Sequence, residues 1–231
     1  MPAAPAPPAA QPACRAQAAA GSAAAPRHDK LPRFGDGRKG RIGLYGGSFN
    51  PAHRGHAHVA AAALRHLALD ALWVLVSPQN PLKPKAGMAP LAERMASARA
   101  VLRDPRITVT AIESLVGTRF TADTLAVLRR RFPRGRFVFV MGADSFAQLH
   151  RWRRWRRILR AVPLAVLPRP GFTRAALSGP AGRRFAASRL PARTASALAG
   201  RMPPAWVVLE IRQDESSASR IRAARRGPGR D

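Results

Sequence analysis

Short apolar runs alternate along the chain with stretches in which apolar residues recur every three to four positions. The runs are apolar throughout, which is typical of strands in a parallel sheet that is covered on both faces. They predict strands at residues 41–47, 71–78, 106–113, 136–144, 162–170 and 205–212. The helical spacing predicts helices at 55–69, 90–104, 121–132 and 217–226, with Thr121 as the N-cap of the third. This alternation predicts an α/β protein with a Rossmann-like, doubly wound parallel sheet.

Two segments lie outside this pattern. Residues 1–39 are mainly Ala, Pro and Gly with scattered charges and no apolar period. We therefore expect a disordered tail there, followed by a single domain at residues 40–231. Residues 171–200 combine small residues with arginines in a weak period, and we expect a loop and one helix in this stretch.

Composition limits the class of protein. The chain has 231 residues, 46% of them apolar, which is enough for one ordinary core. Cys14 is the only cysteine, and this excludes a disulfide framework and a cysteine-rich zinc site. No run reaches the roughly 18 apolar residues that cross a bilayer, and the N-terminus lacks the leucine-rich stretch of a secretory signal. We therefore expect a cytoplasmic protein that needs no membrane; the composition predicts no oligomeric state.

The charge balance points to anionic partners. The net charge is +28, from 40 Lys and Arg against 12 Asp and Glu. Such an excess attracts molecules that carry phosphate, although a coding bias toward arginine gives the same totals. The scarcity of acidic residues argues against an enzyme that holds its metal ions with clusters of carboxylates.

The stretch YGGSFNPAHRGHAHVA, residues 45–60, carries the clearest chemistry. It joins the first predicted strand to the first predicted helix, and open α/β sheets bind ligands at such strand ends. Gly46 and Gly47 allow a tight turn whose backbone N–H groups approach an anion, and the helix adds its positive N-terminus. His53 and His56 lie three residues apart and can face one ligand. A metal site, a phosphate site and an ordinary helix start compete here, and the adjoining glycines favour phosphate.

The segment GGSFNPAHRGH resembles the nucleotide-binding signature of the nucleotidylyltransferase superfamily, whose H-x-G-H box it contains. Its form is similar to G-G-[ST]-F-[DN]-P-x-H-x-G-H of the nicotinate-nucleotide adenylyltransferase family. Further segments resemble that family in order along the chain, namely SPQNPLKPK, RFTADTL, MGADSFAQLHRWRRW, LPRPGF and SASRIR. The last departs at three positions from the family's I-S-S-T-x-I-R box, but it keeps the hydroxyls of Ser217 and Ser219 and the guanidinium of Arg222.

The resemblance implies a sheet of the nucleotidylyltransferase type and a set of site residues. His53, His56 and Arg222 are implied as catalytic residues that contact the ATP phosphates. ATP binding is implied for Gly46, Gly47, Ser48, Phe49, His53, His56, Ser217, Ser219 and Arg222. Binding of the second substrate is implied for Lys83, Phe120, Thr121, Gly142, Asp144 and Trp152. His58 lies outside the box, and we expect it on the helix surface.

The resemblance also implies a reaction, in which the adenylyl group of ATP passes to the phosphate of nicotinate mononucleotide. The products are deamido-NAD and pyrophosphate, in NAD biosynthesis. The attacking phosphate oxygen is already ionised at neutral pH, so positioning and electrostatics carry the catalysis without a general base or a covalent intermediate. A basic site with few carboxylates suits this chemistry. Mg²⁺ is expected as a cofactor held mainly by the ATP phosphates, with no metal ligands from the protein.

The segment RWRRWRRIL, residues 151–159, supports two interpretations. As one amphipathic helix, it places Trp152, Trp155, Ile158 and Leu159 on a single face. Arginines interleaved with aromatic residues also suit RNA. One alternative function is therefore a basic nucleic-acid-binding protein. A second alternative, which follows from the resemblance to the superfamily, is an adenylyltransferase for a different phosphate substrate. Nucleic-acid binding explains the charge but not the ordered series of phosphate motifs, so nucleic acid is not expected as a required partner.

Overall fold

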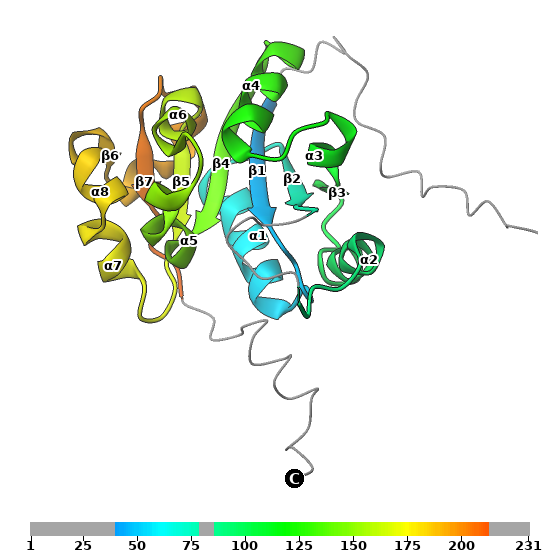
Figure 1. Cartoon of the computed structure of the whole chain (residues 1–231). Helices are drawn as coiled ribbons and strands as arrows, with labels where there is room; N and C mark the ends of the chain where they lie inside the picture. The colour runs from blue at the N-terminus through cyan, green and yellow to red at the C-terminus, as the bar shows by residue number, and fades with distance from the viewer. Residues whose placement is uncertain (1–39, 79–85, 213–231) are drawn as a thin grey trace, which may run out of the picture.

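The computed structural model of the protein describes residues 40–78 and 86–212. Its centre is a seven-stranded sheet in the order β3-β2-β1-β4-β5-β7-β6 (Figure 1), in which every strand pairing is parallel. The strands are β1 (Gly40–Gly47), β2 (Ala71–Val76), β3 (Ile107–Thr110), β4 (Gly135–Gly142), β5 (Leu164–Leu167), β6 (Arg189–Leu190) and β7 (Trp206–Val208). Strand order reverses between β1 and β4, which makes the carboxyl ends of these two strands the expected place for a ligand.

Helices cover both faces of the sheet (Figure 1). The α-helices are α1 (Arg54–His66), α2 (Leu91–Val101), α3 (Ile112–Leu115), α4 (Thr121–Arg131), α5 (Ala143–Ala147), α6 (Trp155–Ala161), α7 (Thr173–Ser178) and α8 (Pro180–Arg184). Short 3-10 helices are η2 (Leu149–Arg151), η3 (Ala186–Ser188) and η4 (Ala192–Gly200). Helices α1, α2 and η4 pack on one face, and helices α3 to α8 pack on the other.

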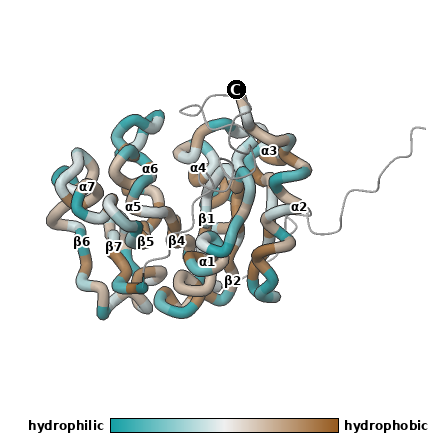
Figure 2. The backbone as a smooth tube through the Cα atoms, turned by 90° about the horizontal axis from the view of Figure 1, so that it is seen from below, coloured by the Kyte–Doolittle hydropathy of each residue, from teal (hydrophilic) through white to brown (hydrophobic). Residues whose placement is uncertain are grey.

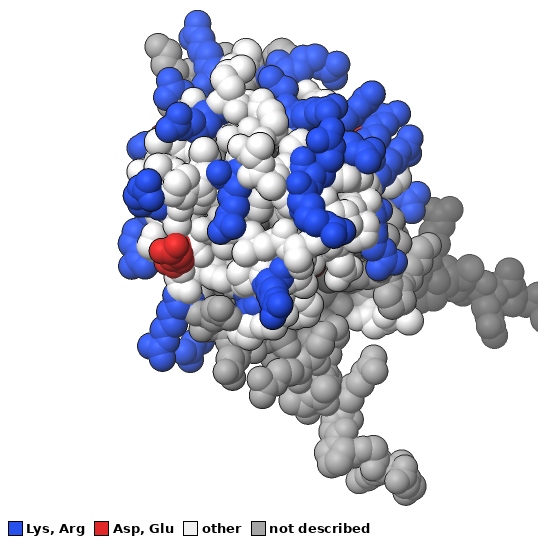
Figure 3. Space-filling view, turned by 90° about the vertical axis from the view of Figure 1, so that its left-hand side faces the viewer, with Lys and Arg blue, Asp and Glu red and all other residues white. Residues whose placement is uncertain are grey.

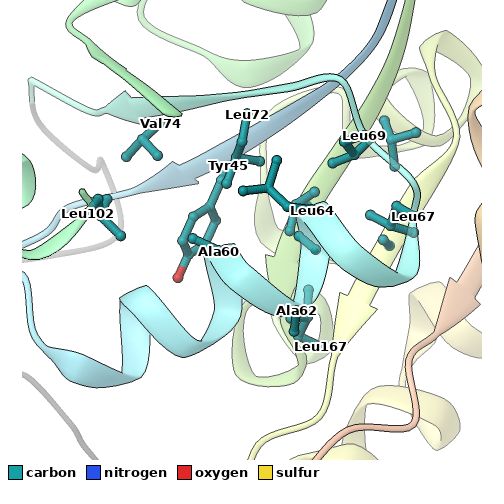
Figure 4. Packing of buried hydrophobic residues seen from close by; sticks show 14 of the residues in the cluster. Tyr45, Ala60, Ala62, Leu64, Leu67, Leu69, Leu72, Val74, Leu102 and Leu167 are labelled. Carbon is teal, nitrogen blue, oxygen red and sulfur yellow. The ribbon is translucent and has the colours of Figure 1, made fainter. Parts of the chain in front are cut away.

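The strands are apolar throughout because both of their faces are buried. Successive side chains of a strand point to opposite faces of the sheet, so Leu44 belongs to the core under α4 while the adjacent Tyr45 belongs to the core under α1. Figure 4 shows Tyr45 extending from β1 toward Ala60 and Leu64 of α1. The predicted α/β fold with a doubly wound parallel sheet is confirmed.

The predicted elements compare unevenly with the structure. All six predicted strands are present, although the later ones are shorter than their apolar runs. The prediction of a loop and one helix for residues 171–200 was wrong, since the stretch forms α7, α8, η3, η4 and the edge strand β6. Thr121 was also the wrong N-cap, because Phe120 occupies that position without a side-chain cap. The predicted tail at residues 1–39 and helix at 217–226 lie outside the described residues.

The prediction of one amphipathic helix at residues 151–159 was wrong as well. Helix α6 begins only at Trp155, and Arg154 before it has a left-handed backbone with φ of 54°. Trp152 therefore lies in the turn between η2 and α6 and does not share a helical face with Trp155. A bend of this kind leaves the local apolar spacing unchanged, so periodicity does not detect it.

Polar segments lie toward the outside of the fold, for example along parts of α6 and α7 (Figure 2). Within residues 40–78 and 86–212, no helix combines the length and the apolar character needed to cross a membrane.

Candidate active site

The loop after β1 leads directly into α1, and two histidines define that helix start. His53 is the N-cap, and its Nδ1 accepts a hydrogen bond from the backbone N–H of Gly55 at 3.2 Å. The Nδ1 of His56 accepts from the backbone N–H of His53 at 3.1 Å, which closes a capping box made of two imidazoles. The ring centroids lie 4.0 Å apart. Because each Nδ1 is an acceptor, each neutral ring carries its proton on Nε2, which is then a hydrogen-bond donor.

Phe49 packs its buried side chain against the loop between β1 and α1. Its φ of 47° turns the chain back, so that the buried ring lies beside Tyr45 at 5.4 Å and His56 at 4.8 Å between centroids. A Cβ on Gly47 would come within 2.9 Å of this ring, so the close approach requires glycine. Any contact of Phe49 with a ligand is therefore expected from its backbone, while its ring orients His56.

The carboxyl end of β4 brings an acidic side chain close to β1. Asp144 in the first turn of α5 forms an ion pair with Arg169, in which Nη1 and Oδ2 lie 2.6 Å apart. Burial raises the pKa of the nearby Tyr45 phenol, the charge of Asp144 raises it further, and Arg169 opposes both effects. A Cβ on Gly142 would lie 2.5 Å from Asp144 Oδ1, so a larger residue at this position would displace the Asp144 carboxylate.

A second cluster forms at the start of α4. Arg153 lies over the ring of Phe120, with its Cζ 4.6 Å from the centroid, and Arg154 pairs with Asp123 at 3.2 Å. These contacts hold the turn that carries the half-buried Trp152 against the N-terminus of α4. The first N–H groups of an α-helix have no intrahelical acceptor. The structure thus brings the predicted residues Phe120, Thr121 and Trp152 into one region.

Two buried charged groups meet at Ser77, at the carboxyl end of β2. Arg94 donates to the carbonyl of Ser77, and the Glu113 carboxyl accepts a hydrogen bond from the Ser77 side chain. Burial raises the pKa of Glu113, and the bond from Ser77 partly opposes that rise. Glu113 is not among the residues that the sequence predicts for the site. The position of Arg94 at the opening of a predicted helix makes it only a weaker candidate for binding a substrate phosphate, and the structure instead buries its guanidinium among backbone carbonyls.

The C-terminal end of the described chain lies against α1. His58, expected on the helix surface, donates through Nε2 to the backbone carbonyl of Arg212 at 2.6 Å in an exposed hydrogen bond, so it has a partner far away in sequence. Several predicted site residues lie outside the described residues, namely Lys83, Ser217, Ser219 and Arg222. Their roles stay predictions.

Positive charge dominates one half of the molecule. Residues 145–209 contain 13 arginines and no Asp or Glu, and Figure 3 shows Lys and Arg side chains spread over the face that carries α7, α8 and β6. Near the two histidines and elsewhere in the described residues, no group of three or more His, Cys, Asp or Glu gathers in a way that can hold a metal ion. The described donors at these strand ends are imidazole, guanidinium and backbone N–H groups, which suit phosphate oxygens.

Comparison with known proteins agrees with this geometry. A family model described as cytidylyltransferase-like matches residues 44–224. A protein of Cereibacter sphaeroides named probable nicotinate-nucleotide adenylyltransferase is 50% identical over 81% of this chain and 99% of its own length. A protein of Gluconacetobacter diazotrophicus with the same name is 52% identical over 84% of this chain and 90% of its own.

Solved structures support the fold. The nicotinic acid mononucleotide adenylyltransferase of Plasmodium falciparum, solved in complex with NaAD, matches with a TM-score of 0.60 and 16% identity. The match covers 79% of this chain and 82% of that one. At this identity the likeness concerns the arrangement of strands and helices alone.

Proposed function

The chain belongs to the nicotinate-nucleotide adenylyltransferases of the cytidylyltransferase-like family, and from this membership we infer that it transfers the adenylyl group of ATP to nicotinate mononucleotide. The structural observation that carries the proposal is the pair His53 and His56 at the point where strand order reverses. The products are deamido-NAD and pyrophosphate. ATP and nicotinate mononucleotide are the proposed partners and the cytoplasm the proposed location, with no required nucleic acid or membrane.

The ATP phosphates are proposed to lie at the start of α1. Backbone N–H groups of residues 46–49 and the Nε2–H groups of His53 and His56 would donate to phosphate oxygens there. The hydrogen bonds at Nδ1 fix both the tautomer and the orientation of the rings, so these donors are arranged before ATP arrives. Ser217, Ser219 and Arg222 are proposed to complete this site.

The chemistry needs alignment more than proton transfer. A phosphate oxygen of nicotinate mononucleotide forms a bond to the α-phosphorus of ATP while the bond from that phosphorus to the pyrophosphate oxygen breaks. Negative charge grows on the leaving pyrophosphate, and donors already aimed at that position stabilise it. The imidazoles serve as donors in this scheme, and neither one needs to accept a proton.

Nicotinate mononucleotide is proposed to bind between the ends of β1 and β4 and the start of α4. Trp152 would stack on the pyridine ring, and the backbone N–H groups of Phe120 and Thr121 would bind the carboxylate. Asp144 accepts from Arg169 through Oδ2, and Oδ1 has the capacity to accept a hydrogen bond from a ribose hydroxyl. Gly142 is proposed to leave room for this contact, and Lys83 to bind the substrate phosphate.

Mg²⁺ is the proposed cofactor. Asp144, the acidic residue described near the ends of β1 and β4, already forms an ion pair with Arg169. The side chains at these strand ends therefore suit phosphate oxygens better than a metal cation. Mg²⁺ keeps several waters and commonly binds to substrate phosphates. We therefore propose that the ATP phosphates hold it, where it would neutralise part of their charge.

The test is a pyrophosphate-release assay on the full chain with ATP and Mg²⁺. Nicotinate mononucleotide and nicotinamide mononucleotide are offered in parallel, and we expect faster release with the acid because helix N–H groups favour a carboxylate over an amide. Release with the amide alone would contradict the proposed substrate. Release with neither would contradict adenylyl transfer to a pyridine nucleotide altogether.

Replacing Trp152 with alanine should raise the KM for nicotinate mononucleotide by about tenfold, since stacking of a base on an aromatic side chain contributes about 1–3 kcal/mol. The KM for ATP should stay within about twofold of the wild type. A tenfold change in affinity corresponds to about 1.4 kcal/mol, so a twofold change means that almost no ATP-binding energy is lost. Trp152→Phe keeps an aromatic ring and should restore most of the affinity. An unchanged KM for the pyridine nucleotide in Trp152→Ala would remove Trp152 from the site.

A further inference from the structure

Arg94 in α2 is a buried arginine whose guanidinium joins three separate pieces of backbone. The residue is only 2% exposed. Its Nη1 donates to the carbonyls of Ser48 at 2.8 Å and Ser77 at 2.7 Å. Its Nη2 donates to the carbonyl of Pro78 and its Nε to that of Ala89, both at 2.9 Å. One side chain thus connects the loop after β1, the loop after β2 and the segment that enters α2.

The charge of Arg94 is not balanced by a carboxylate within the described residues. The hydrogen-bond partners of its guanidinium there are four neutral carbonyls, and burial lowers the pKa of this group. Burying a cation without an ion-pair partner is costly for the folded state. An apolar side chain of similar size would avoid that cost but would not connect the carbonyls, so the connection is what the arginine provides.

Three further hydrogen bonds, made by two side chains, connect the same pieces of backbone. Asn50 donates through Nδ2 to the carbonyl of Gly87 at 2.8 Å and accepts through Oδ1 from the N–H of Ala89 at 3.2 Å. The hydroxyl of Ser97 in α2 accepts from the N–H of Ala52 at 3.1 Å. The loop after β1 is therefore held to α2 and its entry segment on both sides of Arg94.

We propose that Arg94 is a positioning residue for adenylyl transfer, acting through the backbone of Ser48 and Ser77. This inference rests on the proposed function, in which the loop after β1 binds the ATP phosphates. The guanidinium fixes that loop relative to the carboxyl end of β2. In-line transfer requires the two phosphates to be aligned, and a displacement of about 1 Å can lower a rate about 100-fold.

Arg94→Lys is the informative variant because it keeps the charge and loses the planar fork. An ammonium is a compact point charge, and it cannot span the four carbonyls that the guanidinium reaches. We expect kcat per folded molecule to fall about 10- to 100-fold, from misalignment. Each KM should change by less than about threefold, since the loops and their own donors remain, and kcat should therefore carry most of the effect.

Two variants on or beside the same helix provide comparison. Arg103→Lys changes an exposed arginine just after α2, whose Nε bonds the nearby carbonyl of Ala100 at 3.0 Å, and it should leave kcat unchanged. Ser97→Ala removes only the hydroxyl that accepts from Ala52, and it should lower kcat in the same direction by a smaller factor. Ser97→Ala also keeps the proposal testable if Arg94→Lys fails to fold.

Steady-state kinetics and amide hydrogen exchange are measured together, below the unfolding temperature of every variant. Faster exchange in peptides containing Ser48 and Ser77, with a fall in kcat for Arg94→Lys but not for Arg103→Lys, supports the proposal. Equal kinetics in those two variants would overturn it, as would a rise in one KM with kcat preserved. If the wild type itself releases no pyrophosphate, the proposed function fails. Separately, unchanged hydrogen exchange in the Ser48 and Ser77 peptides of Arg94→Lys would show that Arg94 does not fix the loops.

Discussion

We expect His56→Ala to lower kcat about 100- to 1000-fold, because removing one preorganised donor to developing negative charge costs that much in comparable sites. The His56 ring lies 4.8 Å from Phe49 and 4.0 Å from His53 between centroids, and its Nδ1 is held by the N–H of His53. These contacts hold the ring in place. Alanine would leave no Nε2–H to stabilise the pyrophosphate, so the loss should appear mainly in kcat.

His66→Ala is the matched control for this experiment. His66 is on the last turn of the same helix, where its Nε2 lies 3.2 Å from an Arg65 nitrogen, and it lies outside the proposed site. His56→Ala also removes the acceptor of the His53 backbone N–H, and losing this half of the capping box should destabilise the helix start by about 1 kcal/mol. The kcat values are therefore compared at a temperature where both variants are folded. Loss of a donor to the phosphates should lower kcat far more than about twofold. If the kcat of His56→Ala stays within about twofold of the kcat of His66→Ala, His56 does not act on the phosphates.

The main features of the fold can be predicted from the sequence because the central strands are buried on both sides. Each is a run of apolar residues, and the helices α1, α2 and α4 each lie within a stretch whose apolar spacing predicts a helix. The edge strand β6 escapes such a prediction, since Arg189–Leu190 is two residues long and has no apolar run. Its pairing with β7 is a tertiary effect that local pattern does not contain.

The turn at Arg154 shows the same limit on a smaller scale. Apolar spacing from Trp152 to Leu159 fits one helix, but the left-handed backbone at Arg154 breaks it. Contacts with Phe120 and Asp123, about thirty residues away, accompany this break. A residue with a favourable long-range partner can adopt a conformation that its neighbours in sequence do not predict.

The candidate site divides along similar lines. Motifs that follow a strand end, such as the pair His53 and His56, can be placed from sequence because parallel strands end at one edge of the sheet. Arg169 could not be singled out among 40 basic residues, and Arg94 could be named only as a weaker candidate for a substrate phosphate, since what distinguishes both is a partner 16 to 46 residues away. Burial was the missing information for Arg94, and pairing with Asp144 was the missing information for Arg169.

Trp73→Ala should reduce the free energy of unfolding by about 3–5 kcal/mol, the usual cost of deleting a large buried aromatic ring. Trp73 is 3% exposed and lies edge-on to Phe132 at 5.4 Å and beside Phe137 at 5.9 Å between centroids. These three rings connect β2 to the end of α4 and the beginning of β4. Urea unfolding measures the loss, and Trp73→Phe should lose less because it keeps most of the buried area.

The same variant separates stability from chemistry. Trp73 and Phe137 are each the third residue of their strands, whereas the proposed site lies beyond the last residues of β1 and β4. At a temperature where Trp73→Ala remains folded, kcat should therefore stay within about twofold of the wild type. Misalignment of the reacting groups would instead lower kcat about 100-fold. A fall of that size would show that the aromatic cluster sets the spacing of the strand ends, and that the sheet does not keep the site rigid on its own.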